Sequence, residues 1–177
     1  MIKKSFIFLG VILLMGSVGC TDLGSLFSVK VETDFKIDVP VDVSAPLMKT
    51  GPFAFDATKV YDPLSNADLE EYKDQIGDID LSAITGTIKD LSESTVLTET
   101  NLKVSGNGSE VSWDFDNVTL SNGTELSLPD EGTKYTTLSS ILKSLEEVTV
   151  ELSGKSSVNN VTYTLELKLS TTLTVGL

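Results

Sequence analysis

Fifteen residues in strict alternation, from Val29 to Val43, dictate more about the fold than any other stretch of the chain. A period of two places one set of side chains in a core and the other in water, which is the pattern of a β-strand. Pro40 has no N–H to donate to a neighbouring strand, so it indicates an edge position or a break. We expect one long strand with a kink, or two collinear strands. The inward set consists of the odd positions: Val29, Val31, Thr33, Phe35, Ile37, Val39, Val41 and Val43.

The C-terminal part of the chain repeats this pattern, because the odd positions from Val161 to Val175 are apolar, aromatic or threonine. We expect this strand to pair inside its own sheet, beside residues 29–43. The alternative is that it adds to a sheet of a neighbouring molecule.

Shorter alternating runs predict further strands at 53–57, 79–88, 95–105, 111–120, 126–128 and 148–152. In two of these runs the apolar set changes parity, which is typical of a β-bulge: near Ala83-Ile84 and near Asp116-Asn117. In the run 95–105, the face that we expect to be inward holds Val96, Leu102 and Val104. The turns are predicted at Gly106-Asn107-Gly108, at Asn122-Gly123 as a hairpin, and at Asn159-Asn160.

Two short amphipathic helices interrupt the strands. The first is predicted to be capped by Ser65, to run for about three turns and to end at Gly77. The second is predicted to be capped by Thr137. Each helix leads into a strand, which is compatible with a duplicated half, but since only spacing supports a duplication we favour two unrelated helices. The apolar stripes are Leu69, Tyr72 and Ile76 in the first helix, and Leu138, Ile141, Leu142 and Leu145 in the second.

These elements predict an all-β fold, an immunoglobulin-like β-sandwich of about seven to nine strands whose two short helices cover the open ends or one flank. The alternative is a partly closed β-barrel. We divide the chain into a signal peptide (1–19), a lipidated tether (20–28) and a single β-sandwich domain (29–177), which is long enough for one real core. The aromatic residues expected inside are Phe35, Phe53, Phe55, Tyr72, Trp113 and Tyr163.

The N-terminus has the parts of an export signal. A basic start at Lys3-Lys4 precedes about ten apolar residues and a stretch of small residues that ends at Cys20. The apolar run is shorter than the roughly 20 residues that span a membrane. Val18-Gly19-Cys20 resembles the lipobox of bacterial lipoproteins, although Ser17 stands where leucine is usual. The resemblance implies that Cys20 carries a thioether-linked diacylglycerol and that the signal is cut before it.

The chain is also similar to the small outer-membrane lipoproteins of Bacteroidota, in this signal and in its alternating, threonine-rich strands. The resemblance implies a lipid-anchored protein of the cell outer membrane, since several acyl chains together give stable anchoring. Thr21, where aspartate would oppose transfer to the outer membrane, is in line with that location. The leaflet is not implied.

Charge and composition argue against several classes of function. Removal of residues 1–19 takes away two lysines and no acid, so the formal net charge falls from −13 to −15. A nucleic-acid partner is not expected, because phosphate contacts need a basic surface. The chain has no histidine and a single cysteine, which excludes Ser-His and Cys-His catalysis, zinc sites and intramolecular disulfides. We therefore expect no enzyme activity and no cofactor.

Calcium binds oxygen ligands, and Asp114, Asp116 and Asn117 are the candidates for such a site. They lack the spacing of an EF-hand loop, as does a second acidic cluster, so we favour solvated acidic faces and no metal. The second cluster consists of Glu70, Glu71, Asp74, Asp78 and Asp80.

The sequence thus predicts a non-catalytic envelope lipoprotein that serves binding, adhesion or an accessory structural role on the outer membrane, with the membrane as one partner and a protein or glycan as another. One alternative is a carrier of an apolar ligand, which needs an internal cavity of about 300 Å³ or more. Another is a pilus-type subunit; the absence of arginine argues against it, because such subunits are commonly matured by cleavage after arginine.

Overall fold

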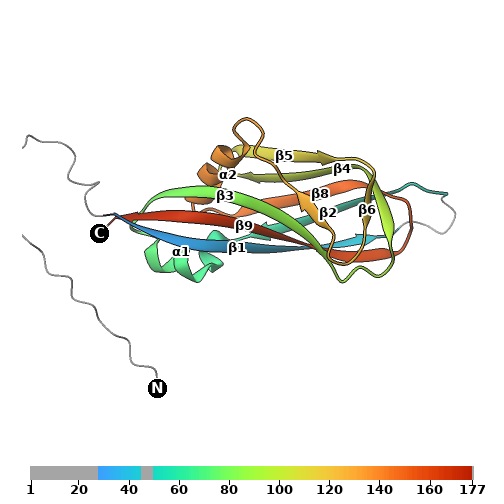
Figure 1. Ribbon diagram of the computed structural model, residues 1–177, viewed down its shortest axis with the longest axis horizontal. Coiled ribbons are helices and arrows are strands. Elements are labelled where there is room, and N and C mark those ends of the chain that lie inside the picture. Colours follow the sequence, from blue (N-terminus) through green and yellow to red (C-terminus); the bar gives the residue numbers. More distant parts are fainter. Residues whose placement is uncertain (1–27, 45–49, 177) are drawn as a thin grey trace, which may run out of the picture.

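The computed structural model describes residues 28–44 and 50–176 as two β-sheets packed face to face (Figure 1). The predicted sandwich with two short helices is confirmed, and its nine strands fall within the predicted range. Each sheet ends in edge strands, so the described chain forms no closed barrel. One sheet has the order β1 (Ser28–Val43), β9 (Val161–Gly176), β3 (Ile76–Lys89) and β7 (Glu125–Ser127). The other has the order β2 (Phe53–Tyr61), β8 (Val148–Ser156), β4 (Thr95–Gly106) and β5 (Ser109–Phe115), and β6 (Val118–Leu120) also pairs with β4.

The first and last strands lie side by side in one sheet, as predicted, and the structure shows that they pair along their whole length. They are antiparallel, with Val29 opposite Val175 and Val43 opposite Val161. Strand β1 runs without a break through Pro40 and pairs with β9 alone, so the predicted edge position is confirmed. Strand β9 lies between β1 and β3 and uses both of its edges within the molecule.

The core lies between the sheets and is built from the alternating residues of both. In β1 the odd positions are fully buried from Phe35 onward, whereas Val29 at the strand start is 45% exposed. Trp113 and Tyr163 are buried as predicted, and Phe53 and Tyr72 are only partly buried. The interior is tightly filled, because the apolar void between the sheets measures only about 10 Å³.

Register shifts mark three irregularities in the paired strands: one in β4 and two in β3, of which the one between Ile76 and Asp78 was not predicted. The predicted bulge in β3 is confirmed, as its register with β9 shifts between Leu81 and Ala83. Strand β4 has a bulge that we did not predict, between Thr98 and Asn101. Before this bulge the buried residues are at odd positions, so the prediction that Val96 faces inward is wrong, although Leu102 and Val104 are buried as predicted.

The predicted helix caps are wrong. Ser65 ends a short 3-10 helix (Pro63–Ser65), and Asn66 caps α1 (Ala67–Tyr72) instead. The Asn66 amide oxygen accepts the backbone N–H of Asp68 at 2.9 Å, so it occupies the position that we gave to serine.

Both helix boundaries differ as well. Helix α1 ends at Tyr72, before Gly77, and Ile76 already belongs to β3. Helix α2 (Lys134–Lys143) begins before Thr137, whose N–H is bonded within the helix to the carbonyl of Thr133. Leu138, Ile141 and Leu142 are buried as predicted, and Leu145 follows the helix, partly buried.

The turn at Asn122-Gly123 is not a hairpin. It carries the chain from β6 in one sheet to β7 in the other. The predicted bulge near Asp116 is also wrong, because β5 stops at Phe115 and Asn117 adopts a left-handed conformation before β6. The turns at Asn107-Gly108 and Asn160 are confirmed, and the first joins β4 to β5 directly.

The helices cover strand edges, in line with the prediction that they cover a flank of the sandwich. Helix α2 lies against β3, where the Tyr135 hydroxyl accepts the N–H of Ile84 at 3.3 Å and Ser139 accepts the N–H of Leu81 at 3.1 Å. These amides lie outside the short pairing of β3 with β7. Such side chains protect an edge that would otherwise offer free backbone groups. Of the helices in the described part of the chain, none has the length and apolar character needed to cross a membrane.

Candidate functional site: a polar hollow at helix α1

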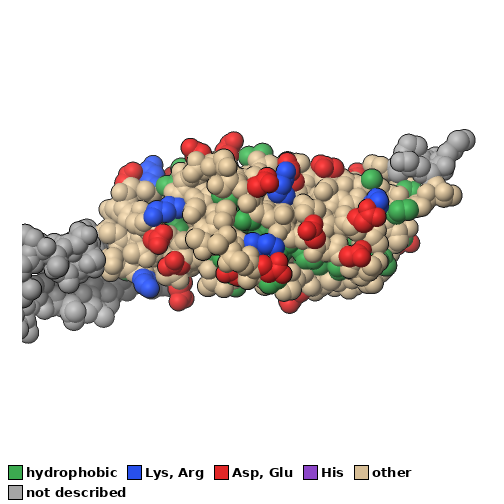
Figure 2. Space-filling model, turned by 90° about the horizontal axis from the view of Figure 1, so that it is seen from above, with side chains coloured by type: hydrophobic (Ala, Val, Ile, Leu, Met, Phe, Trp, Pro, Cys, Tyr) green, Lys and Arg blue, Asp and Glu red, His purple; other side chains and the backbone are tan. Residues whose placement is uncertain are grey.

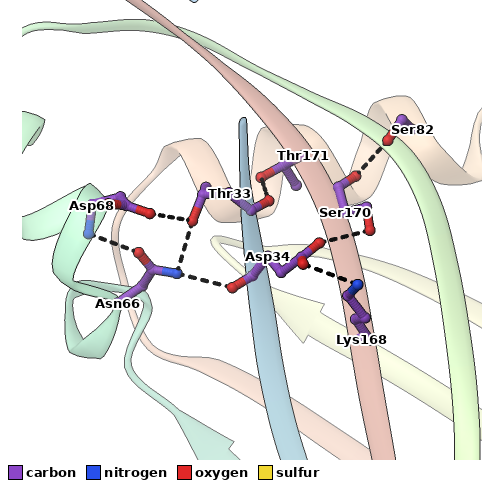
Figure 3. Close-up of polar contacts among 8 residues, drawn as sticks. All are labelled: Thr33, Asp34, Asn66, Asp68, Ser82, Lys168, Ser170 and Thr171. Carbon is purple, nitrogen blue, oxygen red and sulfur yellow. Dashed lines mark hydrogen bonds and ion pairs between the residues drawn. The ribbon is translucent and has the colours of Figure 1, made fainter. Parts of the chain in front are cut away.

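A large hollow lies where α1 meets the edge of the β1–β9–β3 sheet, among the residues drawn in Figure 3. It is open to solvent, has a volume of about 850 Å³ and is lined mostly by polar groups. We call it the polar hollow. Strand β1 supplies residues 32–34, β9 supplies 170–172, β3 supplies Ser82, and residues 66–68 contribute from the start of α1.

Asn66 fixes helix α1, which forms one wall of the polar hollow, to strand β1, which forms the floor together with β9. Its amide oxygen caps α1, and its amide nitrogen donates to the Asp34 carbonyl at 3.1 Å and to the Thr33 hydroxyl at 3.3 Å. The Thr33 hydroxyl in turn donates to the Asp68 carboxylate at 2.7 Å. All hydrogen-bonding groups of the Asn66 side chain are thus occupied, so this residue positions α1 and leaves little capacity for a ligand.

Asp34 lies at the centre of the floor. One carboxylate oxygen accepts the Ser170 hydroxyl at 2.7 Å, and the other forms an ion pair with the Lys168 ammonium at 2.9 Å. The Ser170 hydrogen bond and then the bond and charge of Lys168 hold the pKa of Asp34 below its ordinary value of 3.8. Asp34 is therefore ionised at neutral pH and neutralised locally by a lysine.

The β3 bulge brings Ser82 into the polar hollow. Its hydroxyl donates to the Ser170 carbonyl at 2.9 Å. On the other side of the floor, the Thr171 hydroxyl donates to the Thr33 carbonyl at 3.0 Å, so a side-chain hydrogen bond joins β9 to β1 in addition to the backbone pairing of the two strands. Bulges often redirect a side chain in this way next to functional sites.

Two side chains on the floor keep their full hydrogen-bonding capacity. Glu32 and Thr172 are cross-strand partners in the β1–β9 register. Within the described ranges neither side chain forms a hydrogen bond or an ion pair, and Glu32 is exposed. The polar hollow therefore combines a fixed network with free carboxylate and hydroxyl groups.

The residues singled out in the sequence do not form this site. Cys20 lies outside the described residues. Asp114 accepts the amide of Asn101 at 2.8 Å, and Asp116 accepts that of Asn117 at 2.9 Å. Across residues 28–44 and 50–176, no three acidic side chains come together as metal ligands. The geometry thus gives no support to the calcium candidates.

Asp78, from the second acidic cluster, pairs with Lys143 of α2 at 3.3 Å. Figure 2 shows that acidic and lysine side chains lie interspersed over one whole face of the molecule, without a basic patch. The printed contacts of Asp78, Asp114 and Asp116 are thus those of surface polar residues paired with neighbouring side chains.

Two features of the sequence coincide with the polar hollow. Thr33 is the single polar residue among the odd positions of β1, and the parity change in β3 marks the place where Ser82 is redirected. Neither signal shows that α1 meets β1, because a contact across more than 30 positions of the chain depends on the tertiary fold.

No known protein family matches this sequence, and no curated protein matches it. Among solved structures, a chain of desmodium yellow mottle tymovirus is similar with a TM-score of 0.36 and 14% sequence identity, over 99% of this chain and 96% of that chain. A likeness of this strength carries no argument about function.

Proposed function

We propose that this protein is a non-catalytic lipoprotein of the cell envelope, anchored in the outer membrane through Cys20, that displays its β-sandwich to a protein or glycan partner. The observation that carries the proposal is the course of β1. This strand begins at Ser28, eight positions after Cys20, and runs the length of the sandwich. One end of the sandwich is thus tied to the anchor and the other is held away from it.

The length of β1 sets the distance between the two ends. Sixteen residues of strand span about 50 Å at roughly 3.3 Å per residue. The loops after β3, β6 and β8 gather at the far end, near Val43 (Figure 1). Two of them are joined, because the Leu91 N–H donates to the Asn122 side chain at 2.8 Å. This end presents a preformed polar surface, which suits a binding module.

The polar groups of the described chain favour a non-catalytic role. The pKa values of Asp34 and Glu166 are lowered, Asp34 by Ser170 and Lys168 and Glu166 by Lys89. A general acid at neutral pH needs a raised carboxyl pKa. These carboxylates therefore suit ion pairing better than proton transfer.

The alternatives receive less support. A void of about 10 Å³ between the sheets is far below the 300 Å³ or more of a site for an apolar ligand. Donation of the C-terminal strand, as a pilus-type subunit requires, would remove β9 from between β1 and β3. We keep the immunoglobulin-like comparison only for the two open antiparallel sheets, because here the first strand pairs with the last, whereas that fold pairs other strands.

Metabolic labelling with palmitate tests the anchor. We expect the wild-type chain to take up label and to sediment with membranes, and the Cys20→Ala variant to lose both properties while keeping its folded domain. The matched control is Ser17→Ala, which changes the same segment without removing the thiol. Label retained by Cys20→Ala, or absent from the wild type, would refute the proposal.

A further inference from the structure

We propose that the polar hollow binds a neutral, hydroxyl-rich ligand, a short oligosaccharide. This inference rests on the binding role proposed above and names a ligand class for it. A volume of about 850 Å³ between strands and helix is the size of sites that hold small ligands.

The free groups of the polar hollow match a ligand that both donates and accepts hydrogen bonds. The Glu32 carboxylate accepts only, the Thr172 hydroxyl does both, and the hydroxyl of Ser82, which donates to a backbone carbonyl, still has lone pairs to accept with. The second carboxylate oxygen of Asp68 also has no partner among the described residues. Sugar hydroxyls provide donors and acceptors in the same close alternation.

Other ligand classes fit the lining less well. An anion would meet the carboxylates of Glu32, Asp34 and Asp68, and no lysine lines the polar hollow, since Lys168 is paired with Asp34 beside it. A divalent cation would need several acidic ligands around one point, and in the described ranges no three such side chains, these included, are placed to hold a metal ion. An apolar ligand would cover carboxylates and hydroxyls without pairing them, which costs free energy.

The site is held ready for binding by the network beneath it. Thr33 and Asn66 fix α1 to β1 with three side-chain hydrogen bonds, and Ser170 and Lys168 fix Asp34 to β9. Groups held on rigid strands lose little entropy when a ligand binds, so even a few hydrogen bonds give measurable affinity.

The test is isothermal titration calorimetry of the purified full chain with three neutral trisaccharides: maltotriose, cellotriose and chitotriose. We expect at least one of them to bind. Glu32→Ala and Thr172→Val should each weaken that binding about tenfold or more, through loss of hydrogen bonds to the sugar. The matched controls are Asp38→Ala and Thr164→Val, which change the outer positions of the same two strands away from the polar hollow. They should bind as the wild type does.

Absence of binding to all three trisaccharides would overturn the inference. So would equal affinity in the hollow variants and their controls, or tighter binding of spermidine, a cationic amine without hydroxyl groups. A chain that takes up palmitate but binds no trisaccharide overturns the ligand class and leaves the anchored module standing. A chain that binds the sugar at the polar hollow without taking up palmitate overturns the anchor alone.

Discussion

Tyr163 is buried in the core with a hydroxyl that finds no hydrogen-bond partner among the described residues. Its ring packs edge-on against Phe55, with the ring centres 6.5 Å apart. Burial also raises the pKa of the Tyr163 hydroxyl, since the charged form loses its hydration. The ring therefore contributes to packing, while the hydroxyl costs free energy at this position.

We expect Tyr163→Phe to raise the free energy of unfolding by about 1 kcal/mol, because the ring contact stays and the unpaired hydroxyl is removed. Urea unfolding, followed by the fluorescence of the single tryptophan, measures this change. The control is Tyr72→Phe, a partly buried tyrosine outside the core, which should leave stability within about 0.5 kcal/mol of the wild type. A loss of stability in Tyr163→Phe would show that the hydroxyl has a partner.

Asp34 makes the stability of the folded chain depend on pH in the acid range. Its pKa is lower in the folded chain than its ordinary value of 3.8, so its contribution to stability is full above that value and is lost as the pH falls through the lowered pKa. We expect the wild type to lose more stability between pH 6 and pH 3 than Asp34→Asn does. Urea unfolding at both pH values tests this. Asp38→Asn, on the same face of β1, should behave as the wild type; equal losses in all three proteins would contradict the role of the Asp34 network.

At the scale of elements, the edge of β3 depends on side chains of α2. The Tyr135 hydroxyl accepts the Ile84 N–H and donates to the Leu128 carbonyl at 2.8 Å. We expect Tyr135→Phe to lower the free energy of unfolding by about 1–3 kcal/mol, since both backbone groups lose their partner. Faster hydrogen exchange at Ile84 should accompany the loss. Tyr72→Phe again serves as the control, and unchanged exchange at Ile84 would show that the edge does not rely on α2.

Strands were easier to predict than the features that join them. Alternation in β1 and β9 is a local pattern that also specifies which face of each strand is buried. Helix caps failed because several polar residues compete for one position, and Asn66 rather than Ser65 also reaches the β1 edge. The prediction for Val96 was wrong because of the bulge in β4. At this bulge Glu99 adopts a left-handed backbone conformation, which a glutamate in the sequence does not indicate.

The polar hollow illustrates the limit of sequence reasoning more clearly. Each of its groups is an ordinary polar residue on a strand or at a helix start. The site exists because a bulge, a cap and a cross-strand pair meet at one place, and those three features lie on segments far apart in the chain. Only the tertiary arrangement brings them together.

At the scale of the whole molecule, the elongated sandwich has the two ends that our proposal requires, one for the anchor and one for presentation. The polar hollow lies near the start of β1, on the side proposed to be anchored, and the joined loops lie about 33 Å away, since ten strand positions at roughly 3.3 Å each separate Thr33 from Val43. The strong negative charge of the chain opposes contact of the rod with an anionic membrane surface, which favours an upright average position.

Energy transfer from the protein to labelled lipid head groups tests this arrangement most directly. The chain has one cysteine, and lipidation as proposed occupies its thiol. Lys30→Cys, at the end proposed to be anchored, and Glu93→Cys, at the far end, then each give a single site for a donor dye. In vesicles carrying the acceptor on their head groups, we expect strong transfer from position 30 and weak transfer from position 93. Equal transfer from both positions, or stronger transfer from position 93, would contradict the display of the sandwich away from a membrane anchored through Cys20.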